Sequence, residues 1–334
     1  MSTPQWRWGI AGPGGIASSF AEDMGRVDSG VITALASRSV ERAEAFADRF
    51  EIGSRYGDYR ALADDPAVDI VYIATPHSRH EADTLMYVEA GKHVLCEKPF
   101  ALNARQAQRM ADAARSAGVF LMEAMWSRFL PAYRVLVDVL GEGRIGDALL
   151  VEADFGFRTD VVPGNRHFDL AQGGGALLDL GIYPVQLCSL VLGIPERVVA
   201  DGIVGSTGVD EVVAAVLHHP GNRLGVVKAA LRAPMACTAR IGGTDGVIDL
   251  PALMHCPSSI TVSNMNGVEC IDASWEGPGL RFEVEEVHRC LEAGLTESPS
   301  MPLDESVAIA KTLDAIRAPL GVVYPGEKRR RLKT

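Results

Sequence analysis

The stretch that decides the fold of this chain is Gly9-Ile-Ala-Gly-Pro-Gly-Gly-Ile-Ala17, which follows the strand-like run Trp6–Ala11 and precedes a helical pattern. Gly12, Gly14 and Ala17 occupy the three small positions of the pattern G-x-G-x-x-G/A. Gly12 permits a tight turn, Gly14 lets the backbone approach a pyrophosphate, and Ala17 lets the helix pack closely on the strand. The unpaired N–H groups at the helix N-terminus favour anions. The stretch therefore predicts a dinucleotide-phosphate cradle, although the pattern alone is also found in ordinary glycine-rich turns.

Alternating strands and helices surround this stretch in the first third of the chain. Apolar runs predict strands at 6–11, 31–36, 54–56, 68–74, 93–96 and 119–122, and helical spacing predicts helices at 18–27, 43–50, 80–90 and 103–117. This alternation is typical of a doubly wound parallel sheet with helices on its faces. We therefore expect an α/β nucleotide-binding domain at residues 1–124.

Consecutive strand signals replace the alternation after a helix predicted at 131–141. The expected strands are 148–157, 198–204, 212–218, 224–231, 238–241, 246–250 and 260–262, followed by helices at 282–293 and 304–318. The pattern predicts an α+β domain at residues 125–334, with a largely antiparallel sheet covered by helices on one face. A C-terminal helix can pack back on the first domain. If the other sheet face is apolar, self-association would bury it, so we expect a homodimer or a higher homo-oligomer.

Composition restricts the class of protein and its partners. The chain has 334 residues, of which 47% are hydrophobic, and a net charge of -11. Nucleic acid is not an expected partner, because binding it needs clustered Lys and Arg, and the run Lys328–Lys333 is expected to be a solvated tail. No apolar run approaches the roughly 20 residues of a membrane span, and no secretory signal is readable, so we expect a cytoplasmic protein with no membrane partner. The six scattered cysteines are expected to be reduced thiols.

The end of the second predicted strand indicates which dinucleotide binds. An NAD site usually has Asp or Glu there to accept bonds from the ribose 2'-hydroxyl. This chain has Ser37-Arg38-Ser39, with Arg42 one turn later. A guanidinium matches a phosphate, so these residues predict a preference for the 2'-phosphate of NADP. The alternative is that Arg38 is an ordinary surface residue and that NAD binds.

Two further stretches carry residue types suited to acid–base chemistry. Lys98 follows a strand in Glu97-Lys98-Pro99, at the edge where open α/β sheets bind ligands. Because Pro184 breaks a helix interior, the helix running to Leu192 is expected to begin near Gly181, which would place Asp179 and Tyr183 at or just before its N-terminus. There the helix dipole and a nearby ammonium would favour a phenolate. The alternatives are a surface lysine and a tyrosine packed in the core.

These stretches resemble the glucose-fructose oxidoreductase and inositol dehydrogenase (Gfo/Idh/MocA) family, and most closely its branch of dimeric dihydrodiol and NADP-dependent D-xylose dehydrogenases. The matching stretches, in order, are Gly9–Ala17, Ala36–Arg38, Ile73–His77, Gly91–Pro99, Met122–Phe129 and Gly173–Tyr183. The resemblance implies an N-terminal Rossmann domain and an open sheet in the second domain used for dimerisation.

The resemblance also implies the site residues. Lys98 and Tyr183 would be the catalytic pair, with Asp179 positioning substrate hydroxyls. The glycine turn, including Gly15 and Ile16, would bind the phosphates. The nicotinamide end would be lined by Thr75, Pro76, His77, His80, Glu97, Trp126, Arg128 and Arg166.

The sequence therefore predicts an NADP-dependent oxidoreductase, with NAD possible, that acts on a secondary alcohol of a sugar or of a cyclic diol. One alternative is a non-catalytic NADP(H)-binding sensor or scaffold protein, but the presence of both Lys98 and Tyr183 disfavours it. The other is a methyltransferase, which Arg38 disfavours. His77, His80 and Glu81 do not complete a metal site, so no metal is expected.

Overall fold

The computed structural model describes residues 6–162 and 164–327, which form two compact units. Unit 1 comprises Met1–Ala101, Arg105–Leu130 and Trp275–Val307, and unit 2 comprises Leu102–Ala104, Pro131–Ser274 and Ala308–Thr334. A single boundary at residue 124 was expected, and the chain also returns to unit 1 at Trp275. The basic run Lys328–Lys333 lies outside the described residues.

Unit 1 is built around a six-stranded sheet of order β3-β2-β1-β4-β5-β6, and every neighbouring pair is parallel. Its strands are β1 (Trp6–Ala11), β2 (Gly30–Ala36), β3 (Ser54–Tyr56), β4 (Ile70–Ile73), β5 (His93–Glu97) and β6 (Leu121–Ala124). Its helices are α1 (Gly15–Met24), α2 (Val40–Phe50), α3 (Tyr59–Asp64), α4 (His80–Glu89), α5 (Ala104–Ala117) and α8 (Arg281–Glu292), with 3-10 turns η1 (His77–Arg79) and η2 (Trp126–Phe129). The doubly wound Rossmann sheet is thus confirmed.

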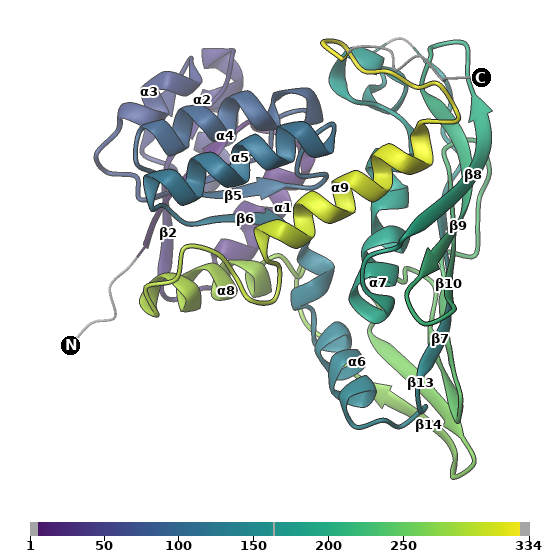
Figure 1. Ribbon diagram of the computed structural model, residues 1–334. Coiled ribbons are helices and arrows are strands. Elements are labelled where there is room, and N and C mark those ends of the chain that lie inside the picture. The colour runs from purple at the N-terminus through teal and green to yellow at the C-terminus, as the bar shows by residue number, and fades with distance from the viewer. Residues whose placement is uncertain (1–5, 163, 328–334) are drawn as a thin grey trace. The chain divides into compact units, whose positions relative to one another are not determined.

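Helices cover both faces of this sheet because its strands are apolar on both sides. Figure 1 shows α4 and α5 on one face, and α1 contacts α8 on the other. Phe20 of α1 stacks on Tyr72 of β4 with ring centroids 3.9 Å apart. Nε1 of the buried Trp8 donates to Nε2 of His288 on α8 at 2.9 Å. These contacts make α8, which comes from the end of the chain, part of the core of unit 1.

Unit 2 contains an eight-stranded sheet of order β14-β13-β12-β11-β7-β10-β9-β8, which is antiparallel except for the pair β7 and β10. Its strands are β7 (Ala148–Gly156), β8 (Arg197–Val204), β9 (Asp210–His219), β10 (Arg223–Ala230), β11 (Ala239–Gly243), β12 (Gly246–Leu250), β13 (Ser259–Asn264) and β14 (Gly267–Asp272). Its helices are α6 (Pro131–Gly141) and α7 (Ile182–Leu192), with short turns η3 (Arg166–Phe168), η4 (Leu170–Gln172) and η5 (Leu177–Gly181). The division between units falls within α9 (Leu303–Arg317).

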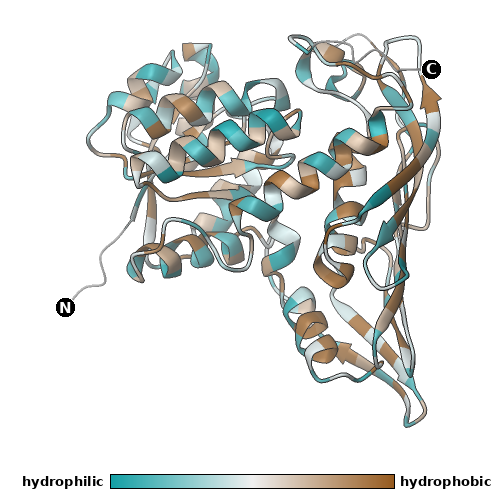
Figure 2. Cartoon of the chain, viewed as in Figure 1, coloured by the Kyte–Doolittle hydropathy of each residue, from teal (hydrophilic) through white to brown (hydrophobic). Residues whose placement is uncertain are grey.

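The two faces of the unit 2 sheet differ. On one face, α7 packs against β7 and β10 and α6 packs against β13. Along most of its length α7 is apolar in Figure 2, and nearly all of it is buried. On the other face, where Figure 1 shows no helix among the described residues, one row of aligned residues crosses all eight strands: Val199, Val216, Val226, Glu152, Arg240, Asp249, Thr261 and Cys270. The expected open sheet is confirmed.

One helical stretch of unit 2, Leu170–Leu192, is long and apolar enough to cross a membrane by length and composition. Most of it is buried inside the protein, as in the core helix of a globular domain. No stretch of this length was expected, because polar residues such as Gln172 and Asp179 interrupt its apolar run.

Candidate functional site

The glycine turn after β1 has the geometry of a phosphate cradle. Gly12 has a φ of +99°, and a Cβ there would lie 2.9 Å from the carbonyl oxygen of Ala74, so no side chain fits. Gly14 precedes the first residue of α1, and a Cβ on it would meet nothing within 4 Å. No acidic residue lies in the first turn of α1, and Ala17 is fully buried against the core. The turn therefore offers open space and free helix N–H groups to the pyrophosphate of a dinucleotide.

The residues after β2 gather positive charge near this turn. Ser37 is buried, and the exposed Arg38 follows it. Arg42, in the first turn of α2, donates to the carbonyl oxygen of Pro13 at 3.3 Å, so this helix is tied to the glycine turn. Burial raises the pKa of the nearby Tyr59 hydroxyl, whereas the guanidinium groups of Arg79, Arg38 and Arg42 oppose that shift. Arg38 and Arg42 thus place positive charge beside the glycine turn, whereas Arg79 is paired with Asp83.

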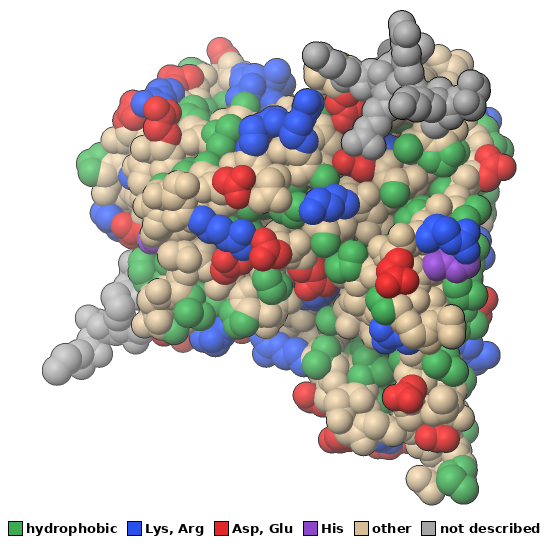
Figure 3. Space-filling view, in the orientation of Figure 1, with side chains coloured by type: hydrophobic (Ala, Val, Ile, Leu, Met, Phe, Trp, Pro, Cys, Tyr) green, Lys and Arg blue, Asp and Glu red, His purple; other side chains and the backbone are tan. Residues whose placement is uncertain are grey.

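Beyond this cluster, basic side chains are dispersed. On the face drawn in Figure 3, Lys and Arg alternate with Asp and Glu in both units. This distribution is in keeping with the net charge of -11.

The loop after β4 carries the next expected residues. Thr75 is buried, and its hydroxyl donates to Asp83 at 2.8 Å. Pro76 leads into η1, which begins with the mostly buried His77. His80 has no exposed surface, and its Nδ1 and Nε2 lie 2.8 Å and 2.9 Å from the carbonyl oxygens of Pro99 and Thr75. Both ring nitrogens thus join two buried loops, and the contact of His80 with nicotinamide stays a prediction.

Lys98 is half-buried directly after β5. The peptide bond between Lys98 and Pro99 is cis. Glu97 is buried, accepts a hydrogen bond from the Tyr72 hydroxyl, and accepts another from the Lys98 N–H at 3.0 Å. The carboxylate of Glu97 thus fixes the backbone from which the Lys98 side chain extends.

Trp126 and Arg128 lie in η2. Trp126 is half-buried, whereas the Arg128 side chain is only 3% exposed. The Arg128 guanidinium binds Glu305 through both of its terminal nitrogens and donates to the carbonyl oxygen of Ser300 at 3.3 Å. Arg128 therefore holds η2 to the segment that enters α9, and the cofactor contact expected for it stays a prediction.

In unit 2, Asp179 is buried and surrounded by two basic side chains. Arg166 approaches both carboxylate oxygens, at 3.2 Å and 3.3 Å, and Nε2 of His167 lies 3.1 Å from Oδ2. Arg166 was expected near the nicotinamide, and the structure instead pairs it with Asp179. His167 was not expected. Sequence patterns do not indicate it, because it lies in an irregular loop whose conformation has no periodic signal.

The turn Gly173–Gly175 brings that loop to Asp179. Gly175 donates to the carbonyl oxygen of His167 at 2.9 Å, and Gly174 donates to that of Asp169 at 2.9 Å. A Cβ on Gly174 would lie 2.6 Å from the His167 carbonyl oxygen, so only glycine fits. Asp210 of β9 accepts a hydrogen bond from the Leu177 N–H at 2.6 Å, at the start of the helix that follows.

Tyr183 does not lie at a helix N-terminus, so this expectation is wrong. The chain is already helical at Ala176 and passes through the π-helical turn η5 into α7. Pro184 is accommodated because η5 replaces the regular carbonyl spacing that its ring would oppose in an α-helix. Tyr183 is therefore two turns inside the helix, beyond the first turn where the helix dipole is effective. Its ring, 5% exposed, packs against Phe155 and His255 at centroid distances of 5.6 Å and 4.9 Å.

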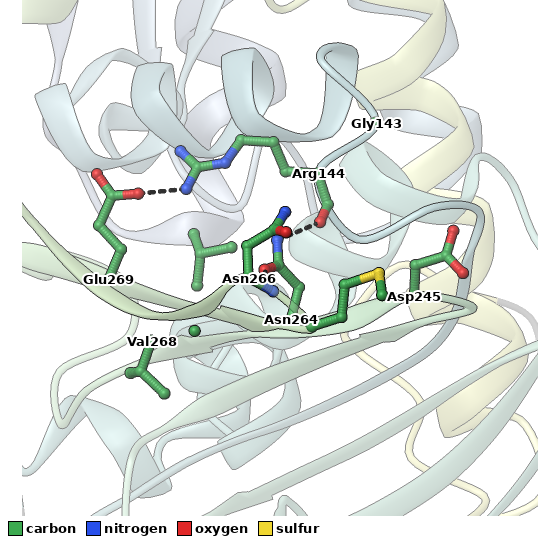
Figure 4. A pocket seen from close by; sticks show the side chains of 10 residues that line it. Gly143, Arg144, Asp245, Asn264, Asn266, Val268 and Glu269 are labelled. Atoms are coloured by element: carbon green, nitrogen blue, oxygen red, sulfur yellow. Dashed lines mark hydrogen bonds and ion pairs between the residues drawn. The ribbon is translucent and has the colours of Figure 1, made fainter.

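A separate hollow lies where β13 turns into β14. Figure 4 shows Arg144 directed toward Glu269, and Asn264 donates to the carbonyl oxygen of Arg144 at 2.9 Å. The hollow is lined by Gly143, Arg144, Asp245, Val262, Asn264, Met265, Asn266, Gly267, Val268 and Glu269. None of them is an expected site residue.

The sheet order of unit 1 and its glycine turn define an NAD(P)-binding Rossmann domain. The model of an oxidoreductase family with an NAD-binding Rossmann fold matches residues 6–125, and the model of the GFO/IDH/MocA C-terminal domain matches residues 133–249. The chain belongs to this oxidoreductase family.

Two relatives are similar over nearly their whole length. Both are trans-1,2-dihydrobenzene-1,2-diol dehydrogenases. The one from Mus musculus is 40% identical over 97% of this chain and 99% of the relative, and the one from Homo sapiens is 39% identical over 97% and 99%. A 3-ketoreductase from Actinomadura kijaniata, solved with NADP and TDP-benzene, has a TM-score of 0.82 and 26% identity over 94% of this chain and 97% of its own. The chain is thus an NAD(P)-dependent oxidoreductase.

The two glycines of the turn make a matched test of the cradle. In Gly14→Ala, the added methyl meets no protein atom within 4 Å but occupies the approach of the pyrophosphate. We expect unfolding without cofactor to be unchanged within about 0.5 kcal/mol, and the dissociation constant for NADP to rise about 10-fold or more.

Gly12→Ala should instead destabilise the protein itself, because the residue has positive φ and meets the Ala74 carbonyl. A loss of about 1–3 kcal/mol is expected. Thermal unfolding and fluorescence titration with NADP measure both effects, and wild-type NADP affinity in Gly14→Ala would contradict the cradle.

Proposed function

We propose that this enzyme oxidises a secondary alcohol of a cyclic diol or of a sugar with NADP, with Tyr183 and Lys98 as its acid–base pair. The observation that supports the proposal most is the 40% identity to a dihydrodiol dehydrogenase over 97% of the chain. The arrangement in unit 2 agrees with it, since Asp179 lies one turn before Tyr183 on a continuous helix and is held by Arg166 and His167.

In the proposed mechanism, the glycine turn with Arg38 and Arg42 would hold NADP, which would supply the acceptor for the hydride of the carbinol carbon. The Tyr183 phenolate takes the proton of the same hydroxyl, so the alcohol becomes a carbonyl and the two electrons leave with the hydride. The ammonium of Lys98 lowers the cost of the phenolate charge, because tyrosine is otherwise a weak base near neutral pH. Asp179 accepts hydrogen bonds from substrate hydroxyls. Arg166 and His167 orient its carboxylate.

The aromatic surroundings of Tyr183 also suit a ring substrate. Phe155 and His255 stack with centroids 4.4 Å apart, and both contact the Tyr183 ring. Flat apolar faces beside an acid–base group favour a six-membered ring with adjacent hydroxyls over an extended chain.

Removal of the Tyr183 hydroxyl tests this mechanism. In Tyr183→Phe, turnover of trans-1,2-dihydrobenzene-1,2-diol should fall about 10²- to 10⁴-fold, because acid–base catalysis contributes that much. NADP binding should not change. Tyr133→Phe is the matched control, since this buried tyrosine donates to the Met254 carbonyl at 3.0 Å and its loss should cost stability without cost to turnover. NADPH absorbance measures turnover, and near wild-type rates in Tyr183→Phe would refute the pair.

We also propose that NADP is preferred over NAD. Arg38 and Arg42 are exposed at the end of β2 and the start of α2, where the ribose 2'-phosphate would lie. A hydrogen bond to a charged group contributes about 1.5–3 kcal/mol.

Replacement of the arginine reverses the local charge. In Arg38→Asp, the KM for NADP should therefore rise roughly 10- to 100-fold, using about 1.4 kcal/mol per factor of ten, while the KM for NAD should fall or stay the same. Arg49→Asp, an exposed arginine at the other end of α2, is the control. An unchanged preference for NADP in Arg38→Asp would contradict the assignment.

The uncovered face of the unit 2 sheet supports a homodimer. Val199, Val216 and Val226 form an apolar row there, and Val199 is 51% exposed. Two ion pairs lie on this face, Arg240 with Asp249 at 2.6 Å and Lys228 with Asp154 at 3.3 Å, and such pairing lowers the cost of burying their charges. We also infer a cytoplasmic enzyme, because all six cysteines are free thiols.

Carboxylates placed in this row should separate the subunits. In Val216→Asp/Val226→Asp, the two new charges face each other across neighbouring strands, so self-association would bury them. We expect sedimentation as a dimer for the wild type and as a monomer for the double variant. Val137→Asp, on an exposed position of α6, is the control. A wild-type monomer would remove the proposal.

A further inference from the structure

Three buried side chains hold the backbone of Lys98-Pro99-Phe100 at consecutive polar groups. Glu97 accepts the Lys98 N–H at 3.0 Å, and His80 binds the Pro99 carbonyl oxygen at 2.8 Å. Oε1 of Glu123 accepts the Phe100 N–H at 2.9 Å. Each of these side chains is at least 94% buried, since their exposed fractions are 6%, 0% and 1%. The turn that presents Lys98 therefore depends on ionisable groups that solvent does not reach.

Glu123 is the member of this group for which no part in binding or chemistry is evident. It lies in β6, aligned with Cys96 of β5, so its carboxyl stands beside the end of β5 and the turn that follows. Its second oxygen, Oε2, accepts no hydrogen bond of regular geometry from the described residues, although the Ser306 hydroxyl is close enough to favour the ionised carboxylate. A buried carboxyl with half of its hydrogen-bonding capacity unused is costly, and such a group needs an explanation.

The surroundings of Glu123 bring the titration of its carboxyl group close to neutral pH. Burial raises the pKa of this carboxyl to about 7, while the Ser306 hydroxyl, the Phe100 N–H and Arg128 favour its ionised form. Glu305, which pairs with Arg128, favours the neutral form. Glu97 and Asp83 are the other acidic groups nearby, since both act with Glu123 on the buried Cys96 thiol. His80, on α4, is the remaining titratable side chain at this turn.

We propose that Glu123 is a positioning residue for Lys98, its ionised carboxylate holding the turn that directs the Lys98 ammonium. This inference rests on the proposed function, in which Lys98 is catalytic. A carboxylate accepts a shorter and stronger hydrogen bond from an N–H than a neutral carboxyl does. The anchor is therefore tight when Glu123 is charged and weak when it is protonated.

The direction with pH follows from these charges. Above about pH 7 the carboxylate is charged and Lys98 is held. Each pH unit below that value removes about nine-tenths of the charged form. Turnover should therefore fall on the acid side with a midpoint near 7, whereas substrate KM should stay constant because Glu123 touches no substrate.

Two substitutions of Glu123 distinguish a role in positioning Lys98 from a role in stability alone. Glu123→Gln keeps only a neutral acceptor for the Phe100 N–H and cannot titrate, so it should hold the turn as weakly as protonated Glu123 does: kcat at pH 8 should drop to the level that the wild type reaches at low pH, and the acid limb near pH 7 should disappear. Glu123→Ala removes the anchor, and kcat should fall about 10- to 100-fold at constant KM, the scale expected for a misplaced catalytic group. Asp23→Asn is the matched control, because this buried carboxylate accepts the Arg281 N–H at 3.1 Å elsewhere in unit 1.

The probes are NADP with trans-1,2-dihydrobenzene-1,2-diol for turnover, and acetic anhydride for the reactivity of the Lys98 amine, read by peptide mass spectrometry. In Glu123→Ala, acetylation of Lys98 relative to Lys92 and Lys228 should change several-fold without any need for turnover. Unaltered Lys98 reactivity in Glu123→Ala, or an acid limb retained in Glu123→Gln, would overturn the inference.

Lys98→Ala distinguishes this failure from that of the proposed function. If Lys98→Ala keeps turnover, Lys98 is not catalytic, and the acetylation experiment alone decides whether Glu123 positions it. If Lys98→Ala loses turnover while Glu123→Ala does not, the catalytic assignment stands and the positioning role is refuted.

Discussion

The backbone of Gly12 is the constraint on which the cofactor site of unit 1 depends. Its N–H donates to the Ala36 carbonyl oxygen at the end of β2, and the position of its missing Cβ is occupied by the Ala74 carbonyl beyond β4. Three strand ends therefore meet within hydrogen-bond distance of one residue. Ser37 and Thr75 follow the two contacted residues directly, so the residues predicted to meet the ribose and the nicotinamide are held by the same contacts that form the phosphate turn. Because no side chain can be added at Gly12, the ends of β1, β2 and β4 keep a fixed arrangement relative to one another.

Unit 2 also contains a close backbone approach that only glycine allows. There the close approach joins two segments of backbone, Gly173–Gly175 and the loop Arg166–Asp169, and the result is that two basic side chains reach a buried aspartate. Asp210 adds a buried carboxylate at the start of the same helix, as Glu123 does at the Lys98 turn of unit 1. Burial raises the pKa of both carboxyl groups to about 7. In each unit, a carboxyl group that is removed from solvent holds the backbone near a candidate catalytic side chain.

Most of the fold could be predicted from the sequence because hydrophobic periodicity reports burial directly. The strands of unit 1 and seven strands of unit 2 follow their apolar runs. β14 was missed because nearly all of its residues are exposed, although Asn266-Gly267 carries a hairpin signal. The start of the helix before α7 was wrong because Pro184 was read as a boundary, whereas a π turn accommodates it. Contacts of His167, Glu123 and Arg128 could not be predicted, since they join irregular loops or strands far apart in the chain.

The π turn Leu177–Gly181 also sets a limit on how the length of this segment can vary. An α-helix advances about 100° per residue. Deletion of one residue from the turn would restore a regular α-helix, and Asp179 would rotate by about that angle relative to Tyr183 and to the Arg166 and His167 side chains. Insertions and deletions, which loops tolerate, would here separate a buried carboxylate from its counter-charges. The segment between Gly175 and Pro184 is thus constrained in its number of residues as strictly as in their chemical type.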